Sequence, residues 1–498
     1  MIFNGISETE DKIQKKFFLE KIDIFCRLVE VFCQKHSLPV LKGKADEKII
    51  GELISYGIIN KDDEISELEK ALSENFHRLI NCTESAVEYK RLMGDLLDKL
   101  SNSKRKKYQE NSGTDYTLAD FFCGAGGLSL GFIQQGFNVK LANDIEDVCI
   151  HTYIYNHPEV PSESVVQGDI KQIVIDIDSY IKNGIDIVIG GPPCQGFSEA
   201  NRQRVIDDPR NELYKYFVKA VEKISPKFVV MENVKGMLKV ADQVVEDFGK
   251  LKVQGEYSYL VSYQVLNSQY FSVAQSRDRL IYIAVRSDVA ECKNITPDKI
   301  FSEIKEECNK NKIYNLSYAL DDIKPLDAPR IKNINEIDDE HTGKKIDVNE
   351  YENNNNEYID LINMGRKIQF VFNHKARYCS DVNYEIYKRL YPGDDATDEK
   401  IRDIMPYAHR NHCFKDKYYK LIADRPCRTI TAHLRMDCHS HIHPTQIRSI
   451  TPREAARIQS FPDDYLFLGP YLKTYMQIGN AVPPVMARTI AKVIKRYL

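Results

Sequence analysis

A cysteine held in a stiff loop is the side chain of this 498-residue chain best suited to act as a nucleophile. Cys194 lies within residues 190–198 (GGPPCQGFS), directly after the β-branched run 185–189 (IDIVI), which is typical of a buried strand. The thiol would therefore sit at the carboxyl end of a strand, where open α/β sheets place their ligands. Two prolines before it restrict the backbone, which suits a nucleophile. The plainer alternative is a small apolar side chain in a turn.

Further polar groups follow two other predicted strands. Glu232 comes directly after the apolar stretch 226–231 (PKFVVM) and would face the same crevice as Cys194. Residues 275–279 (QSRDR) open another strand, in which Gln275, Arg277 and Arg279 would share one face because side chains alternate along a strand. The plainer alternatives are a surface acid at a strand end and an edge strand with solvated arginines.

A glycine-rich loop predicts an adenosine cofactor. A strand at 118–122 leads into residues 123–127 (CGAGG), and a helix is expected over 128–135. The next strand, 139–143, ends at Asp144, about 20 residues after the first glycine, as expected of an acid that binds ribose hydroxyls. This pattern alone would fit a dinucleotide as well as other adenosine cofactors.

The order of these motifs resembles that of the cytosine-5 DNA methyltransferases. The resemblance rests on residues 120–127 (DFFCGAGG), 143–145 (NDI), 168–170 (GDI), 190–198, 232–234 (ENV), 275–279 (QSRDR), 448–457 (RSITPREAAR) and 477–484 (QIGNAVPP). It spans residues 118 to 484. It implies an α/β fold with a doubly wound, Rossmann-like S-adenosylmethionine-binding sheet, a smaller mixed target-recognition domain and an N-terminal helical extension.

By this resemblance the cofactor is S-adenosylmethionine. Phe122 would pack on the adenine, Asp144 and Ile145 would hold ribose and adenine, and Asp169 would accept from the adenine amine. The residues expected at the cofactor are Phe122, Gly124, Gly126, Gly127, Asp144, Ile145, Asp169, Ile170, Pro193, Leu213, Asn480 and Val482.

The same resemblance implies the chemistry and its catalytic residues, Cys194, Glu232, Arg277 and Arg279. Carbon 5 of cytosine is a poor nucleophile, and addition of the Cys194 thiolate at carbon 6 makes the ring electron-rich. Glu232 would bind ring nitrogen 3 and the exocyclic amine and donate a proton, and Arg279 would bind the carbonyl oxygen at position 2. The base must be flipped out of a duplex. The sequence does not identify the base that removes the carbon 5 proton.

Two other functions stay open. A tRNA cytosine-5 methyltransferase shares these motifs, although residues 413–415 (CFK) lack the threonine of its CFT signature. A catalytically silent DNA-binding regulator is the second alternative, against which Cys194 and Glu232 are both present.

Composition favours a soluble cytoplasmic protein, in the bacterial cytosol or nucleoid if the source is prokaryotic. The chain is 43% hydrophobic and 29% charged, and no apolar run approaches the ~20 residues of a membrane span. The first 18 residues do not fit a signal peptide.

The twelve cysteines show no paired framework, and the histidines and cysteines of 433–443 lack the spacing of a zinc site, so we expect no metal. The net charge of −4 means that binding to double-stranded DNA would depend on local basic surface, and a restriction partner would fit this family.

Four segments follow from the pattern. Residues 1–113 are expected to form a helical accessory domain with a linker, which contacts DNA or a protein and can be removed without loss of the catalytic fold. Residues 114–286 would form the cofactor-binding catalytic domain. Residues 287–447, with exposed acidic loops at 333–360 and basic and aromatic clusters after them, would form the target-recognition domain. Residues 448–498 would return to the catalytic domain.

Overall fold

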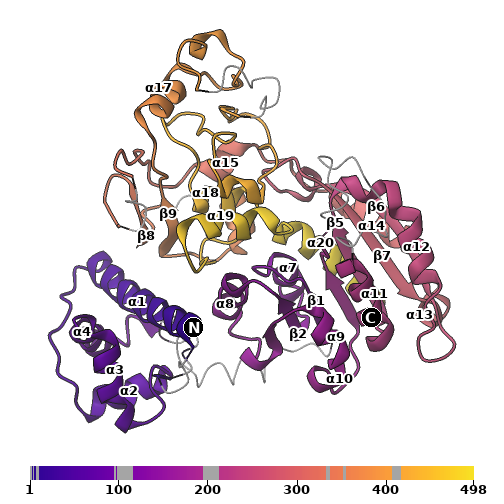
Figure 1. The fold of residues 1–498 in the computed structure, drawn as a ribbon, viewed down its shortest axis with the longest axis horizontal. Helices are drawn as coiled ribbons and strands as arrows, with labels where there is room; N and C mark the ends of the chain where they lie inside the picture. Colours follow the sequence, from indigo (N-terminus) through magenta and orange to yellow (C-terminus); the bar gives the residue numbers. More distant parts are fainter. Residues whose placement is uncertain are drawn as a thin grey trace.

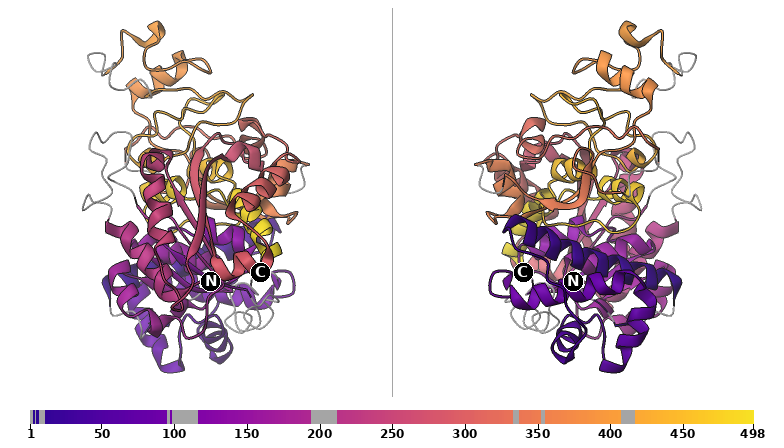
Figure 2. Two further views of the ribbon diagram at one scale, coloured as in Figure 1. Left: turned by 90° about the vertical axis from the view of Figure 1, so that its right-hand side faces the viewer. Right: turned by 90° about the vertical axis from the view of Figure 1, so that its left-hand side faces the viewer.

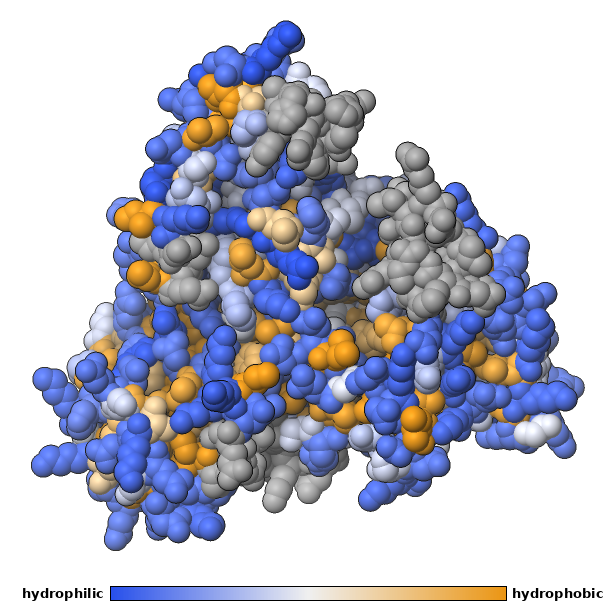
Figure 3. All heavy atoms as spheres, in the orientation of Figure 1, coloured by the Kyte–Doolittle hydropathy of each residue, from blue (hydrophilic) through white to orange (hydrophobic). Residues whose placement is uncertain are grey.

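The computed structural model describes residues 3, 5–6, 11–94, 97, 116–193, 212–332, 337–351, 355–406 and 417–498. Cys194, the polar stretch that follows it and residues 413–415 lie outside these ranges. Within them, no helix is both long and apolar enough to cross a membrane. Polar and charged residues cover most of the face shown in Figure 3, with apolar residues scattered among them.

A seven-stranded sheet in the order β3-β2-β1-β4-β5-β7-β6 forms the centre of the molecule (Figure 1). Neighbours from β3 to β5 pair in parallel, whereas β7 pairs antiparallel with β5 and β6. The carboxyl ends of β1, β2, β4 and β5 therefore meet at one edge of the sheet, where β7 begins. The strands are β1 (Thr117–Phe121), β2 (Asn138–Asp144), β3 (Val165–Gln167), β4 (Ile187–Gly190), β5 (Phe228–Asn233), β6 (Tyr259–Asn267) and β7 (Asp278–Arg286).

Helices cover both faces of this sheet, as its fully buried, β-branched central strands require. Ile187, Val188 and Ile189 are each 0% exposed, so β4 has no solvent face. One hydrophobic cluster contains α7 (Gly127–Ile133), α14 (Pro297–Cys308) and α20 (Pro484–Ile494), and another contains α9 (Ile170–Ile175), α11 (Glu212–Ile224) and α12 (Ala241–Gly249). The predicted doubly wound α/β fold is confirmed.

A second lobe, formed by the described residues between 309 and 480, stands above the sheet in Figure 1. Its strands β8 and β9 pair antiparallel, and α17 lies near the tip of the lobe in the figure. Its elements are α15 (Leu316–Leu320), β8 (Gly343–Val348), α16 (Glu357–Asn363), β9 (Phe370–Lys375), α17 (Asp381–Arg389), α18 (Pro452–Ile458) and α19 (Tyr471–Asn480).

Two expectations about this lobe are corrected. Residues 333–360 are not simply exposed loops, because β8 and the start of α16 lie within them and bury Ile346 (2% exposed) and Tyr358 (0%). The lobe also begins later than residue 287. Helices α13 (Ser287–Lys293) and α14 place Val289, Ile300 and Phe301 in the core of the sheet domain, and α14 packs against β6, β7 and α20.

The N-terminal helices are α1 (Lys12–Lys35), α2 (Glu47–Ser55), α3 (Ile65–Leu72) and α4 (Asn75–Glu88). They carry the indigo end of the colour scale in Figures 1 and 2.

The hydrophobic cluster of these N-terminal helices is shared with Val148, Cys149, Phe370, Phe372, Leu466 and Leu468 from the rest of the chain. The Phe17 ring stacks on His151 of α8 (Asp147–Asn156) at 3.8 Å between centroids. Glu20 accepts a hydrogen bond from the Gly469 amide at 3.0 Å and pairs with Lys345 at 2.5 Å. The described residues before position 95 thus share a core with both lobes, which argues against a domain that can be removed without exposing apolar surface.

The shared core gives a direct test on α1. Phe17 is 3% exposed, and Phe17→Ala should lower the free energy of unfolding by about 3 to 5 kcal/mol because it leaves a cavity between α1 and α8. Ile13 on the same helix is 49% exposed, so Ile13→Ala is the matched control and should change stability little. Thermal or denaturant unfolding measures both. Equal stability of the two variants would contradict a shared core.

Candidate active site

The glycine loop after β1 is shaped by positive backbone φ angles. Phe122, Gly124 and Gly126 have φ of 58°, 54° and 84°. A φ in this range is strained for phenylalanine and accessible to glycine, and such strain is typical of functional loops. A Cβ added to Gly124 would meet nothing within 4 Å, so the loop borders open space that a ligand can approach closely.

Asp144, at the end of β2, holds this loop in place. Its Oδ2 accepts from the Gly124 amide and its Oδ1 from the Glu146 amide, both at 2.9 Å. Burial raises the pKa of Asp144 above its ordinary value, and these two backbone hydrogen bonds oppose the rise. The neighbouring Ile145 is 66% exposed, which leaves an apolar surface beside the carboxylate. A carboxylate, an exposed apolar side chain and an open glycine loop thus lie together at this edge of the sheet.

Other residues expected at the cofactor lie around this point. Asp169 follows β3, and its exposed carboxylate caps α9 by accepting from the Lys171 amide at 3.0 Å. Ile170, in contrast, buries its side chain in the core at 2% exposure, so its side chain does not face the open edge. Leu213 is the second residue of α11 and packs at the margin of the same core.

The C-terminal motif reaches the glycine loop. A Cβ on Gly127 would lie 2.6 Å from the Val482 carbonyl oxygen and 3.0 Å from the Ala481 Cβ, so residues 481–482 rest directly on the start of α7. Asn480, the last residue of α19, is exposed beside them. The contact requires glycine at position 127.

A buried polar clasp, made by Gln275, Arg277 and Gln459, holds this C-terminal segment against the sheet. Arg277 donates to the carbonyl oxygens of Ile430 and Gly479, the latter at 2.8 Å. Gln275 accepts from the Ile430 amide at 2.7 Å and donates to Gln459 at 2.8 Å. Gln459 donates in turn to the Ile478 carbonyl at 2.8 Å.

The clasp corrects the expected position of these residues. Strand β7 begins at Asp278, so Gln275 and Arg277 precede it instead of sharing a strand face with Arg279. Arg277 is 1% exposed and bonds backbone carbonyls, a geometry that favours a positioning role over the catalytic one expected for it. Sequence reasoning missed Gln459, which the structure buries completely.

Glu232 and Arg279 form an ion pair at the same edge of the sheet. Arg279 Nε lies 2.6 Å from Glu232 Oε1, and each side chain is 13% exposed. The distance between Nε and Oε1 is that of a close ion pair. The geometry at Nε does not meet the angle that a hydrogen bond requires. Glu232 Oε2 would lie 3.0 Å from a Cβ on Gly191, so the pair faces the loop after β4.

The loop after β4 is tied to β5 by a residue that the sequence analysis did not single out. Asn233 donates through Nδ2 to the carbonyl oxygen of Pro192 at 3.1 Å. Pro193 is exposed and is the last described residue before Cys194. The structure therefore brings Glu232, Arg279 and the loop leading to Cys194 together, while Cys194 itself lies outside the described residues.

Comparison with known proteins decides the family of this site. A family model of C-5 cytosine-specific DNA methylases matches residues 116–496. The chain belongs to this family. It is thus a DNA cytosine-5 methyltransferase, and the methylase is similar to relatives along most of their length. The type II methyltransferase M1.HphI of Haemophilus parahaemolyticus is 33% identical over 390 residues, which cover 76% of this chain and 86% of that protein. M.DdeI of Desulfomicrobium norvegicum is 31% identical over 76% of this chain and 88% of its own length.

A solved structure supports the same assignment. A provisionally assigned DNA modification methyltransferase encoded within an Escherichia coli prophage superposes with a TM-score of 0.56 at 27% identity, over 77% of this chain and 99% of that one. The N-terminal helices precede the region that the family model matches. Among the described residues of the methylase, no group of three or more histidine, cysteine or acidic side chains could hold a metal ion.

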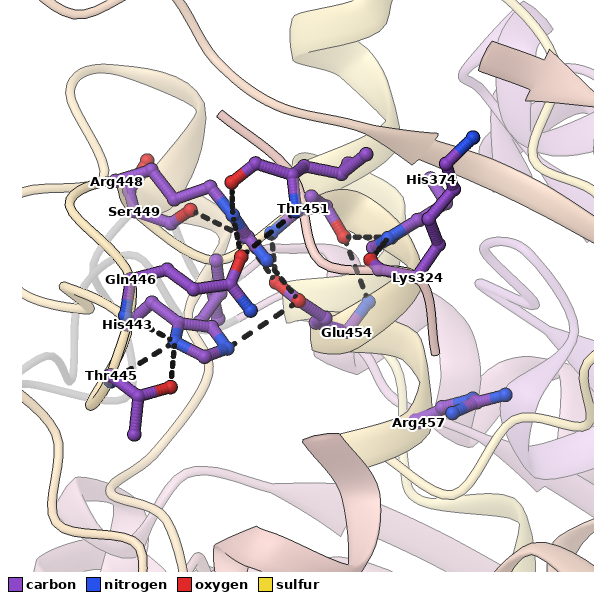
Figure 4. Close-up of polar contacts among 12 residues, drawn as sticks. Lys324, His374, His443, Thr445, Gln446, Arg448, Ser449, Thr451, Glu454 and Arg457 are labelled. Carbon is purple, nitrogen blue, oxygen red and sulfur yellow. Dashed lines mark hydrogen bonds and ion pairs between the residues drawn. The ribbon is translucent and has the colours of Figure 1, made fainter. Parts of the chain in front are cut away.

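A fully buried ion pair supports the second lobe of the methylase (Figure 4). Arg448 contacts Glu454 through two hydrogen bonds of 2.8 and 2.6 Å, and both side chains are 0% exposed. Thr451 and Glu454 form a capping box at the start of α18, as the sequence TPRE predicts. His374 of β9 contacts the Thr451 hydroxyl at 3.0 Å, and His443 Nε2 lies 3.7 Å from Glu454. The pair thus joins β9, the segment 443–451 and α18.

This buried cluster makes stability depend on pH. Burial lowers the pKa of His374 to about 4 and that of His443 to about 3. Burial alone would raise the pKa of Glu454, but the charge and hydrogen bonds of Arg448 hold it below its ordinary value. Between pH 6.5 and 4 the unfolded chain therefore binds protons that the folded chain does not, and acid destabilises the fold.

We expect the free energy of unfolding to fall by about 1.4 kcal/mol per pH unit for each such histidine as the pH drops below about 6.5. His374→Gln should remove one histidine's share of this slope, whatever its effect on stability at neutral pH. His77→Gln, at an exposed position on α4, is the control and should leave the slope unchanged. Denaturant unfolding at several pH values measures it. An unaltered slope in His374→Gln would show that His374 is protonated in the folded state.

Proposed function

We propose that this methylase transfers a methyl group from S-adenosylmethionine to carbon 5 of cytosine in double-stranded DNA, through a covalent Cys194 adduct on a flipped base. The observation that carries the proposal is the Glu232–Arg279 pair set against the loop after β4. A carboxyl group and a guanidinium at that place would complement the amine donor and the two acceptors that a cytosine ring presents along one edge. An extrahelical base is required because its reacting atoms are covered by stacking in a duplex.

The roles of the side chains follow from this placement. The Cys194 thiolate adds to carbon 6, and Glu232 gives a proton to ring nitrogen 3 as the adduct forms. Arg279 is oriented by Glu232 at Nε and by the Asp278 carbonyl at Nη1, 2.8 Å away, and binds the oxygen at position 2. After carbon 5 has gained its methyl group, a base takes the carbon 5 proton, the bond between sulfur and carbon 6 breaks to release the Cys194 thiolate, and ring nitrogen 3 returns its proton to Glu232. Preoriented charges of this kind stabilise a transition state without reorganisation.

The residues around the glycine loop fit S-adenosylmethionine, which supplies the methyl group. Asp144 would accept from the ribose hydroxyls, Phe122 and Ile145 would contact the adenine, and Asp169 would accept from its amine. Gly124, Gly126 and Gly127 would allow close approach of the backbone, with Pro193, Leu213, Asn480 and Val482 completing the pocket. The buried side chain of Ile170 gives it a backbone or supporting role.

An open groove beside the site has the chemistry to hold a nucleic-acid strand. It measures about 540 Å³ and is bordered by Gln269, Ser276, Tyr419, Arg425 and Arg428. Tyr419 holds both arginines, since Arg428 lies 4.7 Å from its ring centroid and Arg425 donates to its hydroxyl. Arg425 is exposed and forms no ion pair with any residue that the structure describes. Ser276, which precedes β7, places this groove near Arg279, so an arginine pair there would contact phosphates.

The relatives named type II methyltransferases favour a role in restriction and modification, and we propose duplex DNA over tRNA as the substrate on that basis. A cognate restriction enzyme would then be its partner, in the cytoplasm. The role in target recognition expected for residues 287–447 then belongs to the part of this range that follows α14.

The decisive experiment compares methyl transfer to unmethylated duplex DNA and to tRNA, using S-adenosylmethionine with a tritiated methyl group. The wild type should label DNA, and Cys194→Ala should abolish labelling while still binding the cofactor, because the thiol acts on the base. DNA with 5-fluorocytosine at the target should trap the wild type covalently, since fluorine blocks the final elimination. Labelling of tRNA alone would favour the RNA enzyme, and an adduct with Cys194→Ala would exclude Cys194 as nucleophile.

The groove makes a separate prediction. Arg425→Ala should weaken DNA binding to all sequences alike and reduce the slope of log affinity against log salt by about 1, as expected for one lost phosphate contact. Arg402, 77% exposed on the same lobe and paired with Glu399, provides the control variant Arg402→Ala. Binding to duplexes at several salt concentrations measures both. A changed sequence preference with an unchanged salt slope would instead make Arg425 a reader of bases.

A further inference from the structure

Behind the glycine loop, a chain of three side chains leads to the Ala125 carbonyl oxygen. Tyr465 donates its hydroxyl hydrogen bond to the Ala125 carbonyl oxygen, across a sequence separation of 340 residues. His157 Nε2 lies 3.1 Å from the same hydroxyl, and His157 Nδ1 lies 3.0 Å from Glu159 Oε1. His157 and Tyr465 are 1% and 3% exposed, whereas the Glu159 side chain is 29% exposed.

These side chains fill the space behind Gly126. A Cβ on Gly126 would lie 2.9 Å from each of three atoms, His157 Nε2, Tyr153 Cδ2 and Tyr465 Oη. The Gly126 amide donates to the Cys123 carbonyl at 2.9 Å, so the peptide between Ala125 and Gly126 is held at both its N–H and its C=O. This peptide sets the direction in which the loop presents its open side to a ligand.

Tyr465 is itself fixed from two directions. Asn156, at the end of α8, exchanges two hydrogen bonds of 2.8 Å with the backbone of Leu466. Arg453 of α18 donates to the carbonyl oxygens of Pro462, at 3.0 Å, and Tyr465. Burial raises the pKa of Tyr465 well above its ordinary value, so its hydroxyl keeps the proton that it donates.

We propose that Tyr465, oriented by His157 and Glu159, is a positioning residue that sets the conformation of the glycine loop for cofactor binding. The proposal rests on the proposed function of that loop as the S-adenosylmethionine site. The Tyr465 hydroxyl acts on the Ala125 carbonyl and touches neither cofactor nor base. Its loss should therefore change cofactor affinity and leave the chemical step intact.

Tyr465→Phe keeps the ring and removes the hydrogen bond. We expect it to weaken binding of S-adenosylmethionine and S-adenosylhomocysteine roughly 3- to 10-fold, the effect of one lost hydrogen bond, with kcat at saturating cofactor within about 2-fold of wild type. Tyr153→Phe is the matched control, since Tyr153 is equally buried against Gly126 but its hydroxyl makes no hydrogen bond to the loop. It should leave the dissociation constant unchanged. Isothermal titration with S-adenosylhomocysteine and the thermal midpoint of each variant give the readouts.

A second pair of variants tests the chain independently of Tyr465. His157→Gln places an amide donor near Nε2 and should retain most of the affinity, whereas His157→Leu should lose it as Tyr465→Phe does. Equal cofactor affinity of wild type and Tyr465→Phe, or equal loss in Tyr153→Phe, would overturn the proposal. A lowered thermal midpoint with unchanged affinity would also overturn it, because that is the result of packing alone. Failure of the wild type to bind either ligand would overturn the proposed function instead.

Discussion

The site depends above all on the satisfaction of buried polar groups at the start of β7. Gln275 and Arg277 are almost completely excluded from water, so their polar groups need protein partners, and the Gln275 amide and both Nη atoms of Arg277 have them. These partners lie in segments that come far later in the chain, around Ile430 and Gly479, and in Gln459. This requirement holds residues 478–482 against the glycine loop. Without it, the glycine loop would lose its contact with residues 481–482.

The same principle operates twice more on a larger scale. Arg448 and Glu454 join β9 to α18 as a buried ion pair, and Arg457 and Asp463 form a second one 2.7 Å apart. Pairs of this kind add little net stability compared with apolar residues, because desolvation offsets their attraction, but removal of one partner leaves a buried charge and is strongly destabilising. They therefore fix which segments meet, and the second lobe can be held in one arrangement although it has few regular elements.

Much of the sheet domain could be predicted from the sequence, since its strands are continuous apolar runs and its turns contain glycine. The edge positions of Asp144 and Glu232 follow from that pattern. The roles of Gln275 and Arg277 could not be read from their spacing, because their partners, the Ile430 amide, the Gln459 side chain and two backbone carbonyls, lie more than a hundred residues away. The packing of α1 against the rest of the chain could not be predicted either. Phe17 and Glu20 fit the pattern of any amphipathic helix, and only the structure shows their contacts with α8 and Gly469. Cys194 stays a prediction, since it lies outside the described residues.

The contact of Tyr465 with Ala125 has a consequence for synthesis of the protein. The glycine loop is among the first parts of the sheet domain to leave the ribosome, yet its supporting hydroxyl, the clasp residue Gln459 and the covering helix α20 all belong to the last part of the chain. Contacts between such distant segments close late, because a long loop must be ordered first. The glycine loop of a nascent chain is thus synthesised long before the segments that support it. The contacts that support the loop can therefore form only after residues 459–494 have been synthesised.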